Sequence, residues 1–421
     1  MLDALEFSPA EAAVAAGGQP GFLFATGIEN SAPVVHGVRR DQIVECGHDV
    51  RWEEDFALVR EVGCRFLRYG PQLHRTLLAP GRHDWSFADE TFAGLRRHGI
   101  TPIVDLCHFG VPDFIGDFQN PDFPEVFADY AGAFAQRFPW VQLYTPVNEM
   151  FITAVFSAKY GWWNEHRCDD QSYVTAIRNI VRANVLAMRA ILAVRPDALF
   201  VQSESTEHFH PECPRALHHA EFRNGERFLT LDLNYGHRVD STMYEFLLDN
   251  GLTRDDYRFF MGAADLRPHC IMGNDWYATN EHLIREDGGS RWAGEVFGYA
   301  PVTRAYHERY RLPVMHTETN CDEGPNGDEA ERWLWKQWAG VMRLRADGVP
   351  LLGFTWYSLT DQIDWDTALR EHRGQVNPRG LYDLDRRPRA VGRAYARLIR
   401  DWSSVLARGG SCLQPALSAV R

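Results

Sequence analysis

Several features that define common protein classes are missing from this sequence. No apolar run approaches the ~20 residues of a membrane-spanning helix, and the first residues contain acids where a secretion signal has Lys or Arg. The eight cysteines are scattered without a C-x-x-C pair, which predicts reduced, mostly buried thiols in a cytoplasmic protein. Positive charge is scarce: the formal net charge is −13. Nucleic acids and anionic membranes are therefore not expected as partners.

A phosphate-binding loop is also missing. The first apolar run is followed by GIEN at 27–30, which does not match the G-x-G-x-x-G pattern of dinucleotide-binding folds. A doubly wound nucleotide-binding sheet, the main structural rival for an alternating α/β chain, is therefore disfavoured.

What the chain does contain is an alternation of apolar runs and amphipathic stretches. In the stretches, apolar residues return every three or four positions, as a helix with one buried face requires. These predicted helices cover 49–63, 87–99, 123–138 and 172–192. The predicted strands lie in eight apolar runs, at 21–28, 65–70, 101–109, 141–149, 199–205, 270–278, 313–319 and 351–359.

Eight strand–helix units predict a single (β/α)8 TIM barrel of the α/β class, with extended loops after the strands. We expect the barrel to span 21–402, between an N-terminal tail (1–20) and a C-terminal tail (403–421). The least periodic part, 206–269, is expected to hold a long loop and one or two extra helices.

Polar side chains follow the predicted strands, at the end of a barrel where active sites form. Glu149 follows the fourth strand and Glu318 ends the seventh, so the two carboxyl groups are expected to face each other across the barrel mouth. Such a pair suits glycoside cleavage by an acid with a raised pKa and a nucleophile with a lowered one. Arg68 and Tyr277 are expected to keep Glu318 ionised, and Asn148 to bind the sugar 2-hydroxyl.

Several motifs resemble glycoside hydrolase family 1, the retaining β-glucosidase family of (β/α)8 barrels. TPVNEM (145–150) resembles T-F-N-E-P, and HTETN (316–320) resembles I-T-E-N-G. The resemblance implies that Glu149 is the acid/base and Glu318 the nucleophile.

Four further stretches are similar to blocks of the same family. RWEEDFALVREVGCRFLRYG (51–70) places Arg68, and GITPIVDLCHFGVPDF (99–114) implies that His108 is a glycone ligand. GNDWYAT (273–279) places Tyr277 beside the nucleophile. GFTWYSLTDQIDW (353–365) resembles W-S-L-L-D-N-F-E-W, which implies a stacking platform at Trp356 and further sugar contacts from Asp364 and Trp365.

The departures from the family pattern fall in the sugar pocket. Glu29 is the nearest counterpart of a first-strand Gln, and Asp275 stands where the family has Asn. Met150 replaces a Pro, and Asp364 shortens a glycone-binding Glu. A substrate other than a plain β-glucoside is therefore expected, and Asp364 argues against a phosphorylated sugar.

The residues predict a cytoplasmic retaining β-glycosidase without metal or cofactor, acting on a small-molecule or oligosaccharide β-glycoside. Two alternatives use the same barrel: a transglycosylase with the same two Glu, and a carbohydrate-binding pseudoenzyme. The cluster Glu204, Glu207, His208 and His210 could ligate a divalent ion, but a solvated loop after the fifth strand is the favoured interpretation. A metal-dependent sugar isomerase would need several acids that converge from different strand ends, and the Glu149–Glu318 pair fits hydrolysis better. Glu29 and Arg68 are also compatible with structural roles, and Trp356 and Trp365 with core packing.

Overall fold

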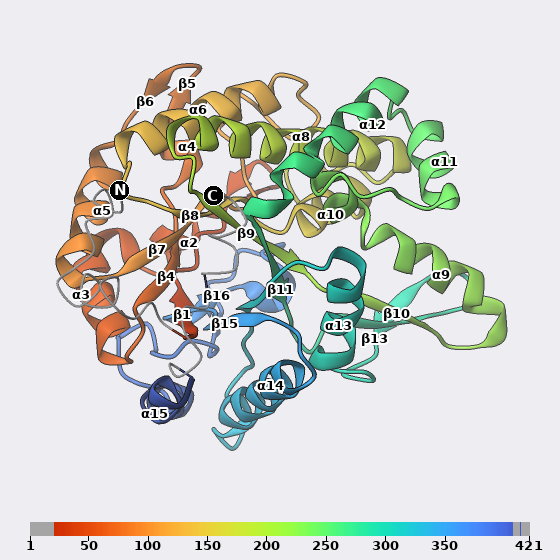
Figure 1. The fold of residues 1–421 in the computed structure, drawn as a ribbon. Coiled ribbons are helices and arrows are strands. Elements are labelled where there is room, and N and C mark those ends of the chain that lie inside the picture. The colour runs from red at the N-terminus through yellow and green to blue at the C-terminus, as the bar shows by residue number, and fades with distance from the viewer. Residues whose placement is uncertain (1–20, 407–412, 414–421) are drawn as a thin grey trace.

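The computed structural model describes residues 21–406 and Leu413. Eight parallel strands close into a barrel, in the order β1-β15-β14-β11-β9-β8-β7-β4 (Figure 1). They are β1 (Leu23–Gly27), β4 (Phe66–Tyr69), β7 (Thr101–Cys107), β8 (Leu143–Val147), β9 (Leu199–Ser205), β11 (Cys270–Asp275), β14 (Val314–Glu318) and β15 (Leu351–Trp356). Each strand lies inside one of the eight apolar runs, so the predicted (β/α)8 barrel is confirmed.

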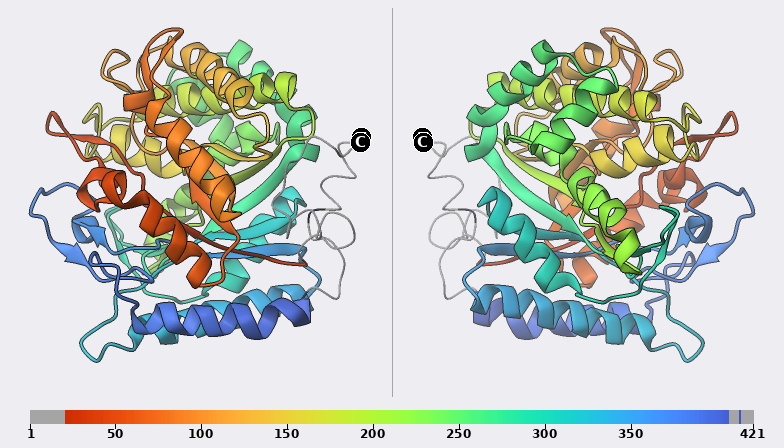
Figure 2. Two further views of the ribbon diagram at one scale, coloured as in Figure 1. Left: turned by 90° about the vertical axis from the view of Figure 1, so that its left-hand side faces the viewer. Right: turned by 90° about the vertical axis from the view of Figure 1, so that its right-hand side faces the viewer.

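Helices surround this barrel, and the four that the sequence predicts are present within two residues of their expected bounds. The helices that follow or precede barrel strands are α3 (His48–Glu61), α5 (Ser86–His98), α6 (Phe123–Arg137), α8 (Asp170–Val194), α13 (Tyr299–Tyr310), α14 (Glu329–Ala346) and α15 (Ala390–Leu406). Local chemistry fixes their ends. Asp169 caps α8 by accepting a hydrogen bond from the Ser172 amide, and Gly99 ends α5 in a left-handed conformation that glycine adopts without strain. In Figure 2, α14 and α15 lie side by side along one edge of the barrel.

The segment after β9 is more ordered than the sequence predicts. In place of one or two helices it contains four, α9 (Leu217–Glu226), α10 (Leu229–Asn234), α11 (Ser241–Asp249) and α12 (Arg254–Met261). They are short, so periodicity reveals them poorly. A small sheet of β10 (His208–Pro211), β12 (Glu281–Ile284) and β13 (Ser290–Trp292) extends this region on the right of Figure 1.

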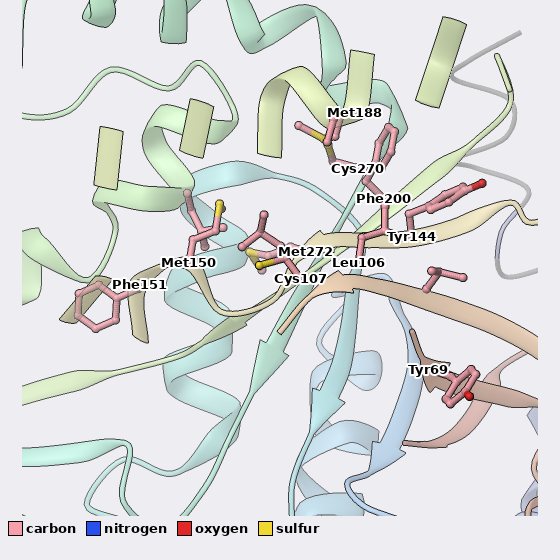
Figure 3. Packing of buried hydrophobic residues seen from close by; sticks show 14 of the residues in the cluster. Tyr69, Leu106, Cys107, Tyr144, Met150, Phe151, Met188, Phe200, Cys270 and Met272 are labelled. Atoms are coloured by element: carbon pink, nitrogen blue, oxygen red, sulfur yellow. The ribbon is translucent and has the colours of Figure 1, made fainter. Parts of the chain in front are cut away.

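The core has two parts, and the inner part does not fill the barrel at the carboxyl ends of its strands. A large apolar layer lies between the strands and the helices, and Figure 3 shows Tyr144, Phe200 and Met188 within it. A smaller cluster fills the barrel interior with one or two side chains from each strand, among them Leu23 and Leu352. Because these come mainly from the first halves of the strands, the polar side chains at the strand ends are left to form a site.

The predicted tails lie mostly outside the described residues. α15 continues to Leu406, four residues beyond the expected end of the barrel, and residues 1–20, 407–412 and 414–421 are not described. Within the described residues no helix is long and apolar enough to cross a membrane. Of the seven cysteines described, Cys46, Cys64, Cys107 and Cys270 are buried, Cys168 is exposed, and all seven are free thiols.

Candidate active site

A cavity of about 1110 Å³ opens at the carboxyl ends of the barrel strands. The structure brings six of the ten predicted site residues into its wall: Glu29, His108, Glu149, Tyr277, Glu318 and Trp365. Arg68 and Asn148 lie directly behind this wall, where they contact its side chains. Trp356 and Asp364 lie elsewhere.

Glu149 and Glu318 approach each other at the inner end of the cavity. An oxygen of each carboxyl group lies within 4.8 Å of the other, and an oxygen of Asp275 lies within the same distance of both. Only 7% of Glu149 and 4% of Glu318 is exposed, so the two groups interact through protein more than through water.

The two carboxyl groups differ in their hydrogen-bond donors. Glu318 is in short contact with the Arg68 guanidinium, and the Tyr277 hydroxyl donates to it at 2.7 Å. Arg68 also donates to Asp105 and to the Asn148 amide oxygen, both at 2.7 Å. The described hydrogen bonds of Glu149 are made by its backbone: its N–H donates to the Ser203 carbonyl at 3.0 Å, and its carbonyl accepts from Thr153. The ionised form is therefore stabilised at Glu318 and not at Glu149.

Electrostatics separate the two groups only in part. Burial raises the pKa of Glu149 well above its usual value, and the neighbouring charges of Asp275 and Glu318 raise it further. The expected lowering of the Glu318 pKa is wrong. Burial and the charge of Asp275 raise that pKa more than Arg68 and Tyr277 lower it. Asp275, a second carboxylate beside Arg68, accounts for the difference from the expected direction.

The backbone around Glu149 is strained. Its φ of 38° lies in the left-handed region that residues other than glycine rarely adopt, and the helix α7 (Met150–Ala154) begins immediately after it. Glu204 holds this turn in place, because its carboxylate accepts hydrogen bonds from the Phe151 amide at 3.1 Å and from the Thr230 hydroxyl at 3.0 Å. Glu204 therefore supports the site from below and is not a solvated loop residue.

His108 and Asn148 form one corner of the site. The Asn148 amide donates to His108 Nε2 at 3.0 Å, while Arg68 fixes the amide oxygen. The position of both side chains is therefore set by the same buried cation that contacts Glu318.

Trp356 is not a platform in the cavity. It is fully buried, and its indole N–H donates to the Arg379 carbonyl at 2.9 Å. The next residue, Tyr357, contributes to the cavity wall instead, with its ring stacked on His108 at a centroid distance of 6.1 Å. Successive side chains of a strand point to opposite faces, so an offset of one residue places Tyr357 in the cavity wall and Trp356 in the core.

Asp364 does not reach the cavity either. Its buried carboxylate binds Arg40 at 2.9 Å and accepts three backbone N–H groups, from Arg373, Gly374 and Gln375. It therefore organises a loop. Gln362, two residues earlier, lines the cavity and donates to Glu29 at 2.9 Å. The sugar contact expected of Asp364 is based on its position in the motif at 353–365. The conformation of this loop places Gln362, and not Asp364, in the cavity wall.

The predicted metal alternative is not supported by the side-chain contacts. Glu207 pairs with His282, and His210 binds Glu281 at 2.6 Å, so the four residues of that cluster do not converge. Within residues 21–406, the one group of three potential ligands that meet is Glu149, Asp275 and Glu318.

Sequence reasoning also missed an aromatic wall at the outer part of the cavity. Phe156, Tyr160 and Trp162 line one side, with Trp162 ring centroids 4.6 Å from Phe156 and 5.0 Å from Tyr160. Phe209 and Trp292 line the cavity as well. Their spacing resembles ordinary helix and turn patterns, so nothing in the sequence marked them.

Comparison with known proteins identifies the class of this enzyme. The chain is a glycoside hydrolase, which cleaves O-glycosidic bonds, and its barrel and relatives agree on a β-glucosidase-like type. It belongs to glycosyl hydrolase family 1, whose model matches residues 13–246, more than half of the chain.

The relatives are distant. Beta-glucosidase A of Thermotoga maritima is 22% identical over 380 residues, covering 79% of this chain and 82% of the relative. The 6-phospho-beta-glucosidase AscB of Escherichia coli is 23% identical over 361 residues, 76% of each chain. The structure of the Thermotoga maritima beta-glucosidase in complex with deoxynojirimycin superposes with a TM-score of 0.77 at 19% identity, covering 90% of this chain and 98% of that one.

Proposed function

We propose that the protein is a retaining β-glycosidase that works through a covalent glycosyl-enzyme intermediate. The approach of Glu149 and Glu318 to within 4.8 Å supports this most directly. Retaining enzymes keep their carboxyl groups about 5–5.5 Å apart, whereas inverting enzymes leave ~6.5–9.5 Å for a water molecule.

In the first step, a Glu318 oxygen attacks the anomeric carbon while Glu149 gives its proton to the glycosidic oxygen, and the bond to the leaving group breaks. In the second step, Glu149 removes a proton from water, the water oxygen bonds to the anomeric carbon, and Glu318 leaves as a carboxylate. Arg68 and Tyr277 donate hydrogen bonds to Glu318 and so favour its ionised, attacking form.

Neutral sugars suit the glycone end of the cavity. Glu29 is 2% exposed there, and its hydrogen-bond partners in the described chain, Ser31 and Gln362, are neutral. A carboxylate without a cation beside it binds sugar hydroxyls and repels a phosphate. Glu29, rather than the buried Asp364, therefore disfavours phosphorylated sugars in this cavity, although the relative AscB is named a 6-phospho-beta-glucosidase.

A panel of chromogenic β-glycosides (gluco, galacto, fuco, manno, xylo and glucurono) combined with 2-fluoroglycosides tests the proposal. We expect one sugar to be cleaved with retention and its 2-fluoro analogue to label Glu318. Glu318→Gln removes both turnover and labelling. Glu149→Gln is expected to lower turnover of poor leaving groups by about 10²–10⁴, with azide restoring turnover as a β-glycosyl azide.

Two other outcomes have defined meanings. Transfer to added alcohols or sugars in excess of hydrolysis would indicate a transglycosylase, since the intermediate is the same. Sugar binding without labelling in any configuration would indicate a pseudoenzyme and would overturn the proposal. The cytoplasmic location stays a prediction, which fractionation of the source cells can test.

A further inference from the structure

A third carboxyl group lies beside the catalytic pair. Asp275 ends β11, where a register shift aligns it with Glu318 of β14. It is fully buried and does not line the cavity, yet one of its oxygens lies within 4.8 Å of oxygens of both Glu149 and Glu318. The family pattern has a neutral Asn at this position, so this chain carries one more ionisable carboxyl group beside the catalytic pair than the pattern does.

The surroundings hold Asp275 as a hydrogen-bond acceptor. The Ser203 hydroxyl lies 2.8 and 2.7 Å from its two carboxyl oxygens. Arg68 donates to the oxygen of that hydroxyl at 2.8 Å, which leaves its hydrogen for Asp275. Asp275 therefore only accepts hydrogen bonds here, and a carboxyl group in that role is most stable in its ionised form.

The positive charge nearby does not balance three carboxylates. Arg68 already contacts Asp105 and Glu318. The charged and titratable groups that face Asp275 or the pair are Arg68, Asp105, His108, Glu149, Glu204, Glu207, Tyr277, Tyr299, Glu318 and Tyr357. Buried like charges this close cannot all ionise at neutral pH, so the group of three retains a proton.

We propose that Asp275 is a positioning residue that keeps this proton on Glu149, by holding a negative charge beside the acid/base. Glu318 has Arg68 and Tyr277 as donors, and Asp275 has Ser203, whereas no donor reaches the Glu149 carboxyl group in the described contacts. The proton therefore resides where the ionised form is least stabilised. This inference rests on the proposed retaining mechanism, in which Glu149 must be protonated before the first step.

The pKa directions agree with the geometry. After burial, Asp275 is the largest cause of the raised pKa of Glu149. Burial raises the pKa of Asp275 itself to about 6, whereas burial and Asp275 raise the pKa of Glu318 to about 8 and that of Glu149 well above its usual value. Asp275 is therefore the carboxyl group of the three that ionises most readily.

Asp275→Asn tests the proposal, because the amide keeps the shape and accepts the Ser203 hydrogen bond without the charge. Loss of the charge makes Glu149 and Glu318 easier to ionise, so both limbs of the pH profile of kcat/KM should move to lower pH, the upper limb by at least about one unit. Glu204→Gln, which replaces a buried carboxyl group outside the group of three, is the matched control and should move the upper limb less. A fall in kcat at every pH with unmoved limbs would show a structural role only.

A second readout needs no turnover. Carboxyl ¹³C titration of protein labelled at glutamate side chains gives the pKa values of Glu149 and Glu318, assigned with Glu149→Gln and Glu318→Gln. The Glu149 resonance should titrate at lower pH in Asp275→Asn, and an unchanged value would overturn the inference even if hydrolysis is confirmed. Asp275→Ser, which also removes the charge, serves if Asp275→Asn does not fold. Conversely, a shifted titration in a protein that 2-fluoroglycosides fail to label would leave Asp275 as proposed and reject the retaining mechanism.

Discussion

Gln362 donates a 2.9 Å hydrogen bond to Glu29 across the glycone end of the cavity. The two residues are 333 positions apart, at the ends of the first and last barrel units. One carboxylate and one amide thus lie together in the cavity wall. In the family pattern the first-strand position is an amide, whereas this chain has the carboxylate of Glu29 there and pairs it with the amide of Gln362.

This pairing predicts a specific pattern of rescue. The Ser31 amide and hydroxyl donate to one Glu29 oxygen, at 3.0 and 2.5 Å. Ser31 therefore fixes an oxygen there, and in Glu29→Gln the new NH₂ would face the NH₂ of Gln362. We expect kcat/KM to fall about 10–100-fold, since a charged hydrogen bond contributes roughly 1.5–3 kcal/mol.

Adding Gln362→Glu restores a carboxylate opposite an amide, and the double variant should recover at least about tenfold over Glu29→Gln. Kinetics on the sugar cleaved fastest by the wild type measure this recovery. If both single variants and the double variant lose activity additively, the two residues do not act as a pair.

Neighbouring variants at 356 and 357 distinguish the core residue from the wall residue. Trp356→Phe removes buried volume and the hydrogen bond to Arg379, so the free energy of unfolding should fall by roughly 1–3 kcal/mol with little change in KM. Tyr357→Ala removes a ring from the cavity and should raise KM about threefold to tenfold. Denaturant unfolding and steady-state kinetics on both variants check the assignment, and a large KM effect from Trp356→Phe alone would contradict it.

These two positions also show where sequence information ends. The periodicity of apolar runs located all eight strands, because burial between barrel and helices imposes it. Strand-end placement also located Glu149, Glu318, Arg68 and Tyr277 at one site. Local register decides whether Trp356 or Tyr357 points into the cavity. The hydrogen bonds of the following loop decide whether Asp364 or Gln362 reaches it. A sequence motif specifies neither the strand register nor the loop hydrogen bonds.

Glu204 should make stability depend on pH. Burial raises its pKa to about 8 in the folded protein, above the ordinary value of 4.5. Its contribution is therefore fully present below about pH 4.5 and is lost as pH rises toward 8, with a slope of up to about 1.4 kcal/mol per pH unit for one proton.

Glu204→Gln removes this titration, so its free energy of unfolding should change less between pH 5 and 8 than that of the wild type. Urea unfolding at a series of pH values measures the difference. Parallel curves for the two proteins would show that Glu204 does not hold its proton in the folded state. Glu165 is a half-buried glutamate whose pKa burial raises to about 7, and Glu165→Gln should flatten the curve only up to that pH.

The aromatic wall predicts a preference for planar leaving groups. Trp162 lies on the cavity between Phe156 and Tyr160, and the Arg370 guanidinium lies 4.2 Å from its ring centroid on one side. An aryl group entering past Glu149 would stack against this wall, whereas a methyl group is too small to reach it. Trp162→Ala should therefore raise KM for aryl glycosides about threefold to tenfold and leave the KM for methyl glycosides of the same sugar unchanged.

Trp335→Ala, at a tryptophan that is 39% exposed on α14 and outside the cavity wall, controls for the general loss of a ring. Equal losses on aryl and methyl glycosides would mean that Trp162 supports the glycone end or the fold, because only a leaving-group contact distinguishes the two substrates.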